Sequence, residues 1–126
     1  MGKIDISTRN APAALGPYSQ AIKVGDFLFC SGQIPLDPQS GKIVGEDIKT
    51  QTEQVLKNLD AILKAERLGF SNVVKTTVFL TDISEFAEMN EVYGKYFMSP
   101  YPARSTVQVS ALPRGAKIEI ELIANL

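Results

Sequence analysis

The segment DIKTQTEQVLKNLDAILKAER, residues 47–67, carries the clearest helical pattern in the chain. One face of the predicted helix is mostly apolar, with residues recurring every three or four positions. This face consists of Ile48, Thr52, Val55, Leu56, Leu59, Ile62 and Leu63. The opposite face carries Lys49, Glu53, Lys57, Asp60 and Lys64. The pattern predicts one long helix with one buried face, ended by Gly69.

Segments with strand character lie on both sides of this helix. They are rich in β-branched and aromatic residues and are bounded by turn residues, as in the hairpin signal at Gly25-Asp26. The predicted strands are residues 18–24, 27–31, 73–80, 102–109 and 116–124, with a short edge strand at residues 3–7.

A second, shorter helix is predicted between the strands at 73–80 and 102–109. Asp82 or Ser84 is its expected N-cap, and Glu85 completes a capping-box pattern from Asp82. We expect Pro100 and Pro102 to stop it.

The order of these elements predicts an α+β fold. Two amphipathic helices can cover one face of a single mixed β-sheet and build a core there. The second face of that sheet is half apolar, which suggests that other subunits cover it. The length of 126 residues fits one domain, residues 1–126.

Composition excludes several classes of partner. Thirteen basic and fourteen acidic residues leave a net charge of −1, and no basic run stands out. We therefore expect neither a nucleic-acid partner nor an anionic membrane surface. No apolar stretch reaches membrane-spanning length, and the N-terminus shows no secretory signal. These features, with a single cysteine, favour a reduced, cytoplasmic setting.

The chain contains no histidine, and Cys30 is its one cysteine. Histidine-activated nucleophiles and imidazole acid–base catalysis are therefore excluded, and we expect no metal site. The apolar neighbours of Cys30 favour a buried, unreactive thiol. Chemistry must rest on carboxylates, arginine, lysine, tyrosine, hydroxyls, backbone groups and water.

The predicted strands at 102–109 and 116–124 carry the strongest candidate site. Arg104, Thr106 and Gln108 share one face of the first strand, and Glu119 and Glu121 share one face of the second. If these strands pair with their apolar faces together, a guanidinium, a hydroxyl and a carboxylate meet on the other side. Such a set can bind a small carboxylate and move a proton. An alternative is a structural cross-strand ion pair between Arg104 and a glutamate.

Four further residues are candidates with open alternatives. Tyr18 lines a ligand site or lies at the edge of the core. Ser31 and Gly32 can bring backbone groups close to a ligand, because glycine permits close approach. Asn90 is unusual inside a helix and is a ligand contact or an exposed residue.

Six segments together resemble the reactive intermediate deaminase (Rid/YjgF) family, and within it the 2-iminobutanoate/2-iminopropanoate deaminase subgroup. The resemblance spans nearly the whole chain in order and spacing. The segments are NAPAALGPYSQA (10–21), SGQIPLDP (31–38), VKTTVFL (74–80), FAEMNEVY (86–93), PARS (102–105) and IEIE (118–121).

This resemblance implies a chorismate-mutase-like fold and a homotrimer whose three sheets form a central barrel, with sites between subunits. It implies hydrolysis of enamine and imine intermediates to 2-oxo acids and ammonia without a cofactor. Arg104 would hold the substrate carboxylate, Glu119 would position or activate water, and Tyr18 would line the pocket from a neighbouring chain. The residues that would shape the pocket are Ser31, Gly32 and Asn90.

Thr106 departs from the family pattern, because many members of the subgroup carry cysteine at this position. A threonine hydroxyl can still hydrogen-bond a ligand or water. A non-catalytic protein that binds 2-oxo acids therefore remains an alternative. A translation-inhibiting ribonuclease is a third interpretation, which the charge and the absence of histidine disfavour.

Overall fold

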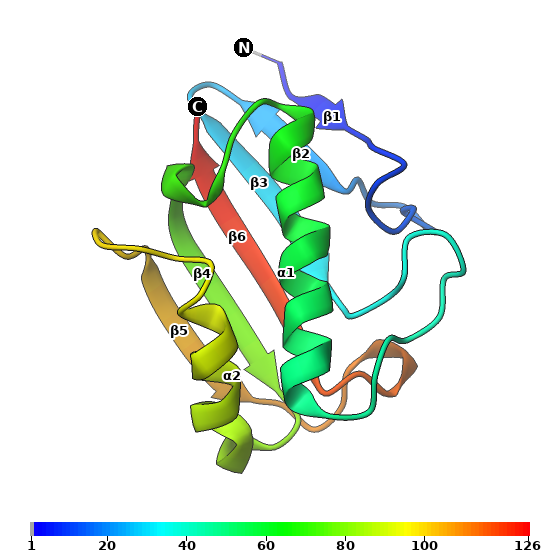
Figure 1. Ribbon diagram of the computed structural model, residues 1–126. Helices are drawn as coiled ribbons and strands as arrows, with labels where there is room; N and C mark the ends of the chain where they lie inside the picture. Colours follow the sequence, from blue (N-terminus) through cyan, green and yellow to red (C-terminus); the bar gives the residue numbers. More distant parts are fainter. Residues whose placement is uncertain (1) are drawn as a thin grey trace.

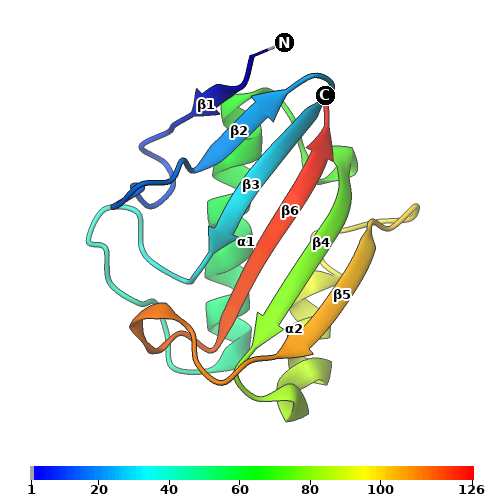
Figure 2. The same cartoon turned by 180° about the vertical axis from the view of Figure 1, so that it is seen from behind.

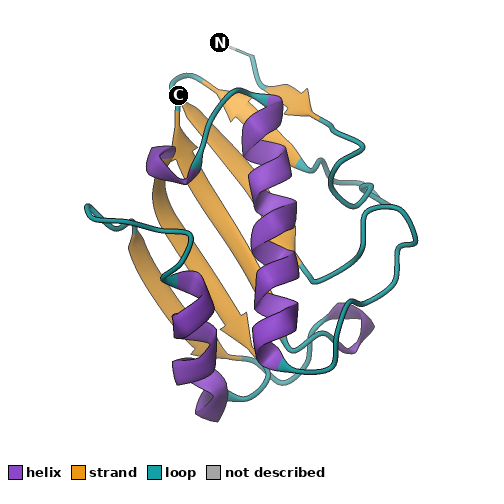
Figure 3. Cartoon of the chain, viewed as in Figure 1, coloured by secondary structure: helices purple, strands orange, loops and turns teal. Residues whose placement is uncertain are grey.

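The computed structural model describes residues 2–126 and contains one six-stranded sheet with two α-helices on one face (Figures 1 and 3). The strands are β1 (Ile4–Ile6), β2 (Ala21–Val24), β3 (Phe27–Gln33), β4 (Val73–Leu80), β5 (Ala103–Gln108) and β6 (Ile118–Asn125). The helices are α1 (Ile48–Ala65) and α2 (Phe86–Tyr93), with 3-10 turns at Phe70–Asn72, Ile83–Glu85 and Pro113–Gly115. The strand order is β1-β2-β3-β6-β4-β5, and only β4 and β5 are parallel. The predicted α+β class and the mixed sheet are confirmed.

Helix α1 has the predicted buried face, but its C-terminal capping motif differs from the predicted one. The carboxylate of Asp47 accepts a hydrogen bond from the Thr50 backbone N–H and caps the first turn. At the other end the helix is terminated by Arg67 rather than Gly69, because Arg67, with φ of 59°, adopts the left-handed conformation. The Leu68 N–H then donates to the Leu63 carbonyl at 2.9 Å. Because Leu68 packs against the core, this motif ends the helix without glycine.

Helix α2 is shorter than predicted, and its capping also differs. Asp82 accepts from the Ser84 N–H, but it caps a 3-10 turn rather than α2, and Glu85 lies 3.5 Å from the Lys117 ammonium. The helix ends at Tyr93, well before the prolines. Gly94 is a weak helix former, and the next two N–H groups, those of Lys95 and Tyr96, bond to carbonyls only three residues back.

The arginine strand does not pair with the last strand, as the candidate site required, because β4 lies between β5 and β6. Strand β6 alternates fully buried residues along its length, which suits a central position. Strand β5 is polar and partly exposed, which suits an edge. The sequence pattern showed both strands but carried no direct signal of the strand between them.

The two candidate side chains of these strands lie on opposite faces of the sheet. Arg104 is in register with buried Thr76, which is in register with buried Leu122, so Arg104 is on the helix-covered face. Glu119 is in register with Phe79 of β4. Phe79 is an odd number of residues from Thr76, and side chains alternate along a strand, so Glu119 is on the other face. The prediction that they meet on one face of one chain is therefore wrong.

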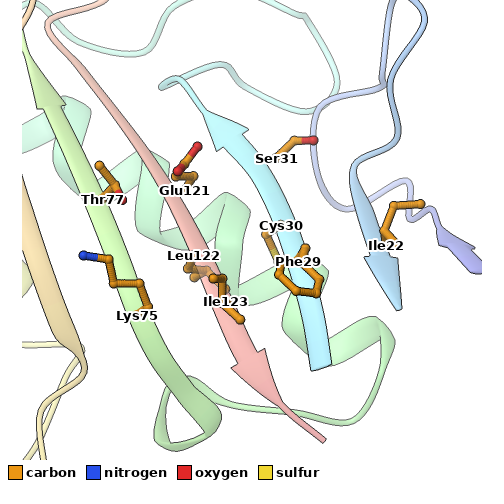
Figure 4. A pocket seen from close by; sticks show the side chains of 9 residues that line it. All are labelled: Ile22, Phe29, Cys30, Ser31, Lys75, Thr77, Glu121, Leu122 and Ile123. Atoms are coloured by element: carbon orange, nitrogen blue, oxygen red, sulfur yellow. The ribbon is translucent and has the colours of Figure 1, made fainter. Parts of the chain in front are cut away.

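The second face of the sheet carries no helix (Figure 2). Phe27, Phe29 and Val107 are each more than 40% exposed there. A shallow cavity of about 310 Å³ on this face is lined by side chains that include Phe29, Lys75 and Glu121 (Figure 4). The predicted half-apolar second face is present. Cys30 is buried, and burial raises the pKa of its thiol to about 12, which suits an unreactive cysteine.

Candidate functional site

Arg104 lies on β5 beside one face of α2. Its Nη1 donates a 2.7 Å hydrogen bond to Asn90 Oδ1. The guanidinium carbon lies 4.7 Å from the centroid of the Tyr93 ring and 5.4 Å from that of Phe86. Within residues 2–126 no carboxylate forms a salt bridge with Arg104. The predicted alternative of an intrachain ion pair is therefore not observed. The forked guanidinium of Arg104 still has N–H donors with which it can bind a planar anion.

We call the surrounding cavity the Arg104 pocket. Its volume is about 440 Å³, and its lining residues are Asn90, Tyr93, Gly94, Tyr101, Pro102 and Arg104. The Tyr93 and Thr76 hydroxyls lie 2.7 Å apart and fix the ring beneath the guanidinium. Burial raises the pKa of Tyr93, so its hydroxyl stays neutral.

Two aromatic residues that contact Arg104 were missed by the sequence analysis. Phe86 and Tyr93 stack against Arg104 by cation–π contacts, which orient the guanidinium and leave its edge open. Phe86, Asn90 and Tyr93 recur at i, i+4 and i+7, so all three point from one face of α2. This spacing was the signal that could have found them.

Glu119 lies in a second cavity of about 430 Å³, the Glu119 pocket. Pro12, Ala13, Tyr18, Ser31, Gly32, Gln33, Ile34, Leu36, Pro113 and Glu119 line it. Burial raises the pKa of the Glu119 carboxyl, and the neighbouring charge of Glu121 raises it further. A carboxyl with a raised pKa in a mainly apolar pocket is suited to accept a proton from water.

A β-bulge in β3 shapes this pocket. Cys30 pairs with Leu122 and Gln33 with Ile120, so Ser31 and Gly32 together oppose the single residue Glu121. The side chain of Glu119 lies against Gly32, where an added Cβ would be 2.1 Å from Glu119 Oε2. The absence of a side chain at Gly32 is what lets the carboxylate occupy this position.

Ser31 and Tyr18 join Gly32 at the bulge. The Ser31 hydroxyl donates to the Ser19 carbonyl at 2.6 Å, which ties the bulge to the segment before β2. Tyr18 is 54% exposed, and its hydroxyl accepts a hydrogen bond from the Leu15 N–H. The structure therefore brings Tyr18, Ser31, Gly32 and Glu119 together, whereas Asn90 lies with Arg104.

Thr106 lies on the helix-covered face, two residues after Arg104, but lines neither pocket. Its hydroxyl oxygen is buried and has no hydrogen-bond partner among residues 2–126. Its part in substrate binding stays a prediction.

The described residues form neither a metal-binding cluster nor a membrane-spanning helix. No group of three or more cysteine, aspartate or glutamate side chains in residues 2–126 is arranged to hold a metal ion. Neither of the helices described in this range has the length and apolar character needed to cross a membrane.

The sequence of this chain is similar to one family model and to several known proteins. The family model described as Endoribonuclease L-PSP matches residues 8–126. Reactive Intermediate Deaminase A, chloroplastic, of Arabidopsis thaliana is 59% identical over 96% of this chain, which spans 65% of that protein. The human 2-iminobutanoate/2-iminopropanoate deaminase is 52% identical over 94% of this chain and 87% of its own length.

A solved structure agrees with these relatives. In the crystal structure of E. coli TdcF with bound serine, the chain is 44% identical to this one. The match covers 98% of both chains, with a TM-score of 0.93.

The cytoplasmic location of the protein stays a prediction. With a family match over nearly its full length, and with more than half of its aligned residues identical to those of two named deaminases, this chain belongs to the Rid/YjgF/L-PSP family.

Proposed function

We propose that this protein hydrolyses 2-iminobutanoate and 2-iminopropanoate to the corresponding 2-oxo acids and ammonia. The human 2-iminobutanoate/2-iminopropanoate deaminase and the Arabidopsis Reactive Intermediate Deaminase A share 52% and 59% of their aligned residues with this chain. The observation that carries the proposal is the pair of pockets on opposite sheet faces, one with an arginine fork and one with a carboxyl of raised pKa. The substrate needs both groups, so two copies of the chain must form each site.

In this mechanism, Arg104 binds the carboxylate of the imino acid through parallel N–H donors. Protonation of the imine nitrogen makes the adjoining carbon electrophilic. Glu119 accepts a proton from a water molecule as the water oxygen bonds to that carbon. Glu119 then returns this proton to the carbinolamine nitrogen and takes up the hydroxyl proton as the C–N bond breaks. Ammonia leaves, the carbonyl forms, and the carboxyl releases its proton to solvent. Positioning of the reactants and one group that handles protons suffice for this reaction.

The assembly we propose is a homotrimer whose sheets face inward as a barrel. The exposed Phe27, Phe29 and Val107 support it, because such apolar side chains on a sheet are usually covered. In a closed ring, each copy contacts the next through two different surfaces. The Arg104 pocket of one copy can then face the Glu119 pocket of its neighbour at all three interfaces.

The test couples the protein to threonine dehydratase, which generates the imine, with semicarbazide as a competing trap. We expect added protein to accelerate formation of 2-oxobutanoate and ammonia and to reduce the trapped adduct. Saturable binding of 2-oxobutanoate in calorimetry without any acceleration would instead support the binding-protein alternative. The same preparation is incubated with RNA, because the family description names an endoribonuclease. Cleavage of RNA without imine hydrolysis would contradict the proposal.

The raised pKa of Glu119 predicts a pH dependence with a defined sign. Because the ionised carboxylate is the active form, kcat/KM should fall as pH decreases through a pKa above the ordinary value of 4.5. Replacing Glu121 with glutamine removes one cause of the shift, so the acid limb should move to lower pH. The measurement is kcat/KM against pH for both proteins with the same substrate, which cancels the ionisation of the imine.

The control for this profile is Glu46→Gln, which removes an exposed carboxylate that lines neither pocket. Its acid limb should coincide with that of the wild type. Coincident limbs for wild type and Glu121→Gln would contradict the assignment of the limb to Glu119.

A further inference from the structure

Two buried side-chain amides lie directly behind the walls of the Glu119 pocket. Gln20 is 3% exposed and Asn58 is 1% exposed. Each donates to backbone carbonyls of a segment that lines the pocket, and neither lines the pocket itself. Buried amides are costly unless they are hydrogen-bonded, so such bonds hold their partners in place.

Gln20 holds the wall formed by the segment before β2. Its Nε2 donates to the carbonyls of Thr8, Ala11 and Pro12 at 3.0, 3.3 and 2.7 Å. Its Oε1 accepts from the Thr8 N–H at 2.7 Å. Its backbone carbonyl accepts from the Ser31 N–H at 2.9 Å, so one residue joins this segment to the bulge.

The irregular segment that contains Pro12 has no sheet ladder of its own. Pro12 and the next residue, Ala13, line the Glu119 pocket. The four side-chain bonds of Gln20 therefore replace the ladder that would otherwise fix this wall.

Asn58 holds the second wall from α1. Its Nδ2 donates to the carbonyls of Ile34 and Leu36 at 3.3 and 3.0 Å, and both residues line the pocket. Gln54 Nε2 donates to Asn58 Oδ1 at 2.9 Å and fixes the orientation of the amide. The wall is thus attached to the longest helix, an element with a fully buried face.

Resting on the proposed function, we propose that Gln20 and Asn58 are positioning residues that hold the two walls of the Glu119 pocket at the separation the substrate requires. Neither touches the reacting atoms. The walls contact the part of the substrate that does not react, so their displacement weakens ground-state and transition-state binding equally. Such a loss raises KM and leaves kcat nearly unchanged.

The test compares Gln20→Met and Asn58→Leu with Gln51→Met as a matched control. Gln51 is also 3% exposed and bonds to two backbone groups, the Gly45 carbonyl and the Lys117 N–H, of residues that do not themselves line the pocket. We expect KM for 2-iminobutanoate to rise about 10-fold in the two test variants, with kcat within about 2-fold of wild type. An unchanged KM, or an equal rise in Gln51→Met, would overturn the proposal.

Hydrogen exchange gives a second readout that needs no turnover. Amides of residues 8–14 should exchange faster in Gln20→Met, and those of residues 34–36 in Asn58→Leu, with neither changed in Gln51→Met. If the wild type hydrolyses no imine, the proposed function fails, and the exchange still decides the positioning role. Unchanged exchange in both walls overturns it.

A milder variant covers the case in which Asn58→Leu does not fold. Gln54→Met leaves Asn58 in place but removes the bond that orients it. It should raise KM and speed exchange at residues 34–36 in the same direction, by a smaller factor. If folded Gln54→Met has the KM of the wild type and the same exchange at residues 34–36, the proposed positioning role of Asn58 is overturned.

Discussion

Replacing Arg104 with alanine is expected to lower kcat/KM for 2-iminobutanoate on the order of 10²- to 10³-fold, because it leaves the substrate carboxylate unpaired in a pocket. The guanidinium is already oriented by Asn90 and by the rings of Phe86 and Tyr93, so little reordering is needed on binding. Steady-state kinetics in the coupled assay measure the loss. Arg104→Lys should recover part of the activity, since it restores charge without the fork.

Arg67→Ala is the matched control for this substitution. It removes an exposed guanidinium that lines neither pocket and should keep wild-type kinetics. An Arg104→Ala variant with wild-type kcat/KM would contradict the proposed role of the fork.

A mixing experiment tests whether two copies share each site. Arg104→Ala and Glu119→Gln should each be nearly inactive as pure proteins. When equal amounts are unfolded together and refolded, about one site in four should combine an intact Arg104 with an intact Glu119 across a heterologous interface. Activity should therefore recover to about a quarter of the wild-type value on this statistical basis. No recovery in a correctly assembled mixture would contradict a shared site.

Gly32→Ala is expected to lower kcat on the order of 10²-fold with little change in melting temperature, because it displaces the Glu119 carboxylate by roughly 1 Å. The added Cβ would lie 2.1 Å from Glu119 Oε2, the end of a flexible side chain that can move aside. The fold can therefore accommodate the methyl group with little loss of stability, whereas the reaction depends on the position of the carboxylate and is slowed. Kinetics and thermal unfolding on the same preparation separate these effects.

Gly69→Ala is the control, because a Cβ there meets no atom within 4 Å and the φ angle of −135° suits alanine. It should change neither kcat nor melting temperature. If Gly32→Ala keeps wild-type kcat, the position of the Glu119 carboxylate is not critical for the reaction.

Much of the fold was predictable from local sequence patterns. The apolar face of residues 48–63 predicted α1, and alternating β-branched residues predicted the strands. The errors lay where local signals compete with tertiary contacts. Arg67, rather than Gly69, turns the chain after α1 because Leu68 gains a place against the core. Gly94 ends α2 before the prolines can act.

The candidate site was predictable by residue but not by arrangement. Tyr18, Ser31, Gly32 and Glu119 do lie together, and Arg104 and Asn90 are hydrogen-bonded. The bulge at Ser31 and Gly32 left no local signal, because it depends on the register between β3 and β6. The amide of Asn58 was also hidden, since its backbone partners are more than twenty residues away in the chain.

By itself, the sequence determined which segments become helices and strands, which faces are apolar, and which chemistry is available without histidine. These properties follow from neighbouring residues and their spacing. Only the tertiary structure decided that β4 separates β5 from β6, and so placed Arg104 and Glu119 on opposite faces. Strand order depends on the burial of whole faces across the sheet. The alternating pattern of one strand is the same whichever strand pairs with it, so the pattern does not indicate the neighbour.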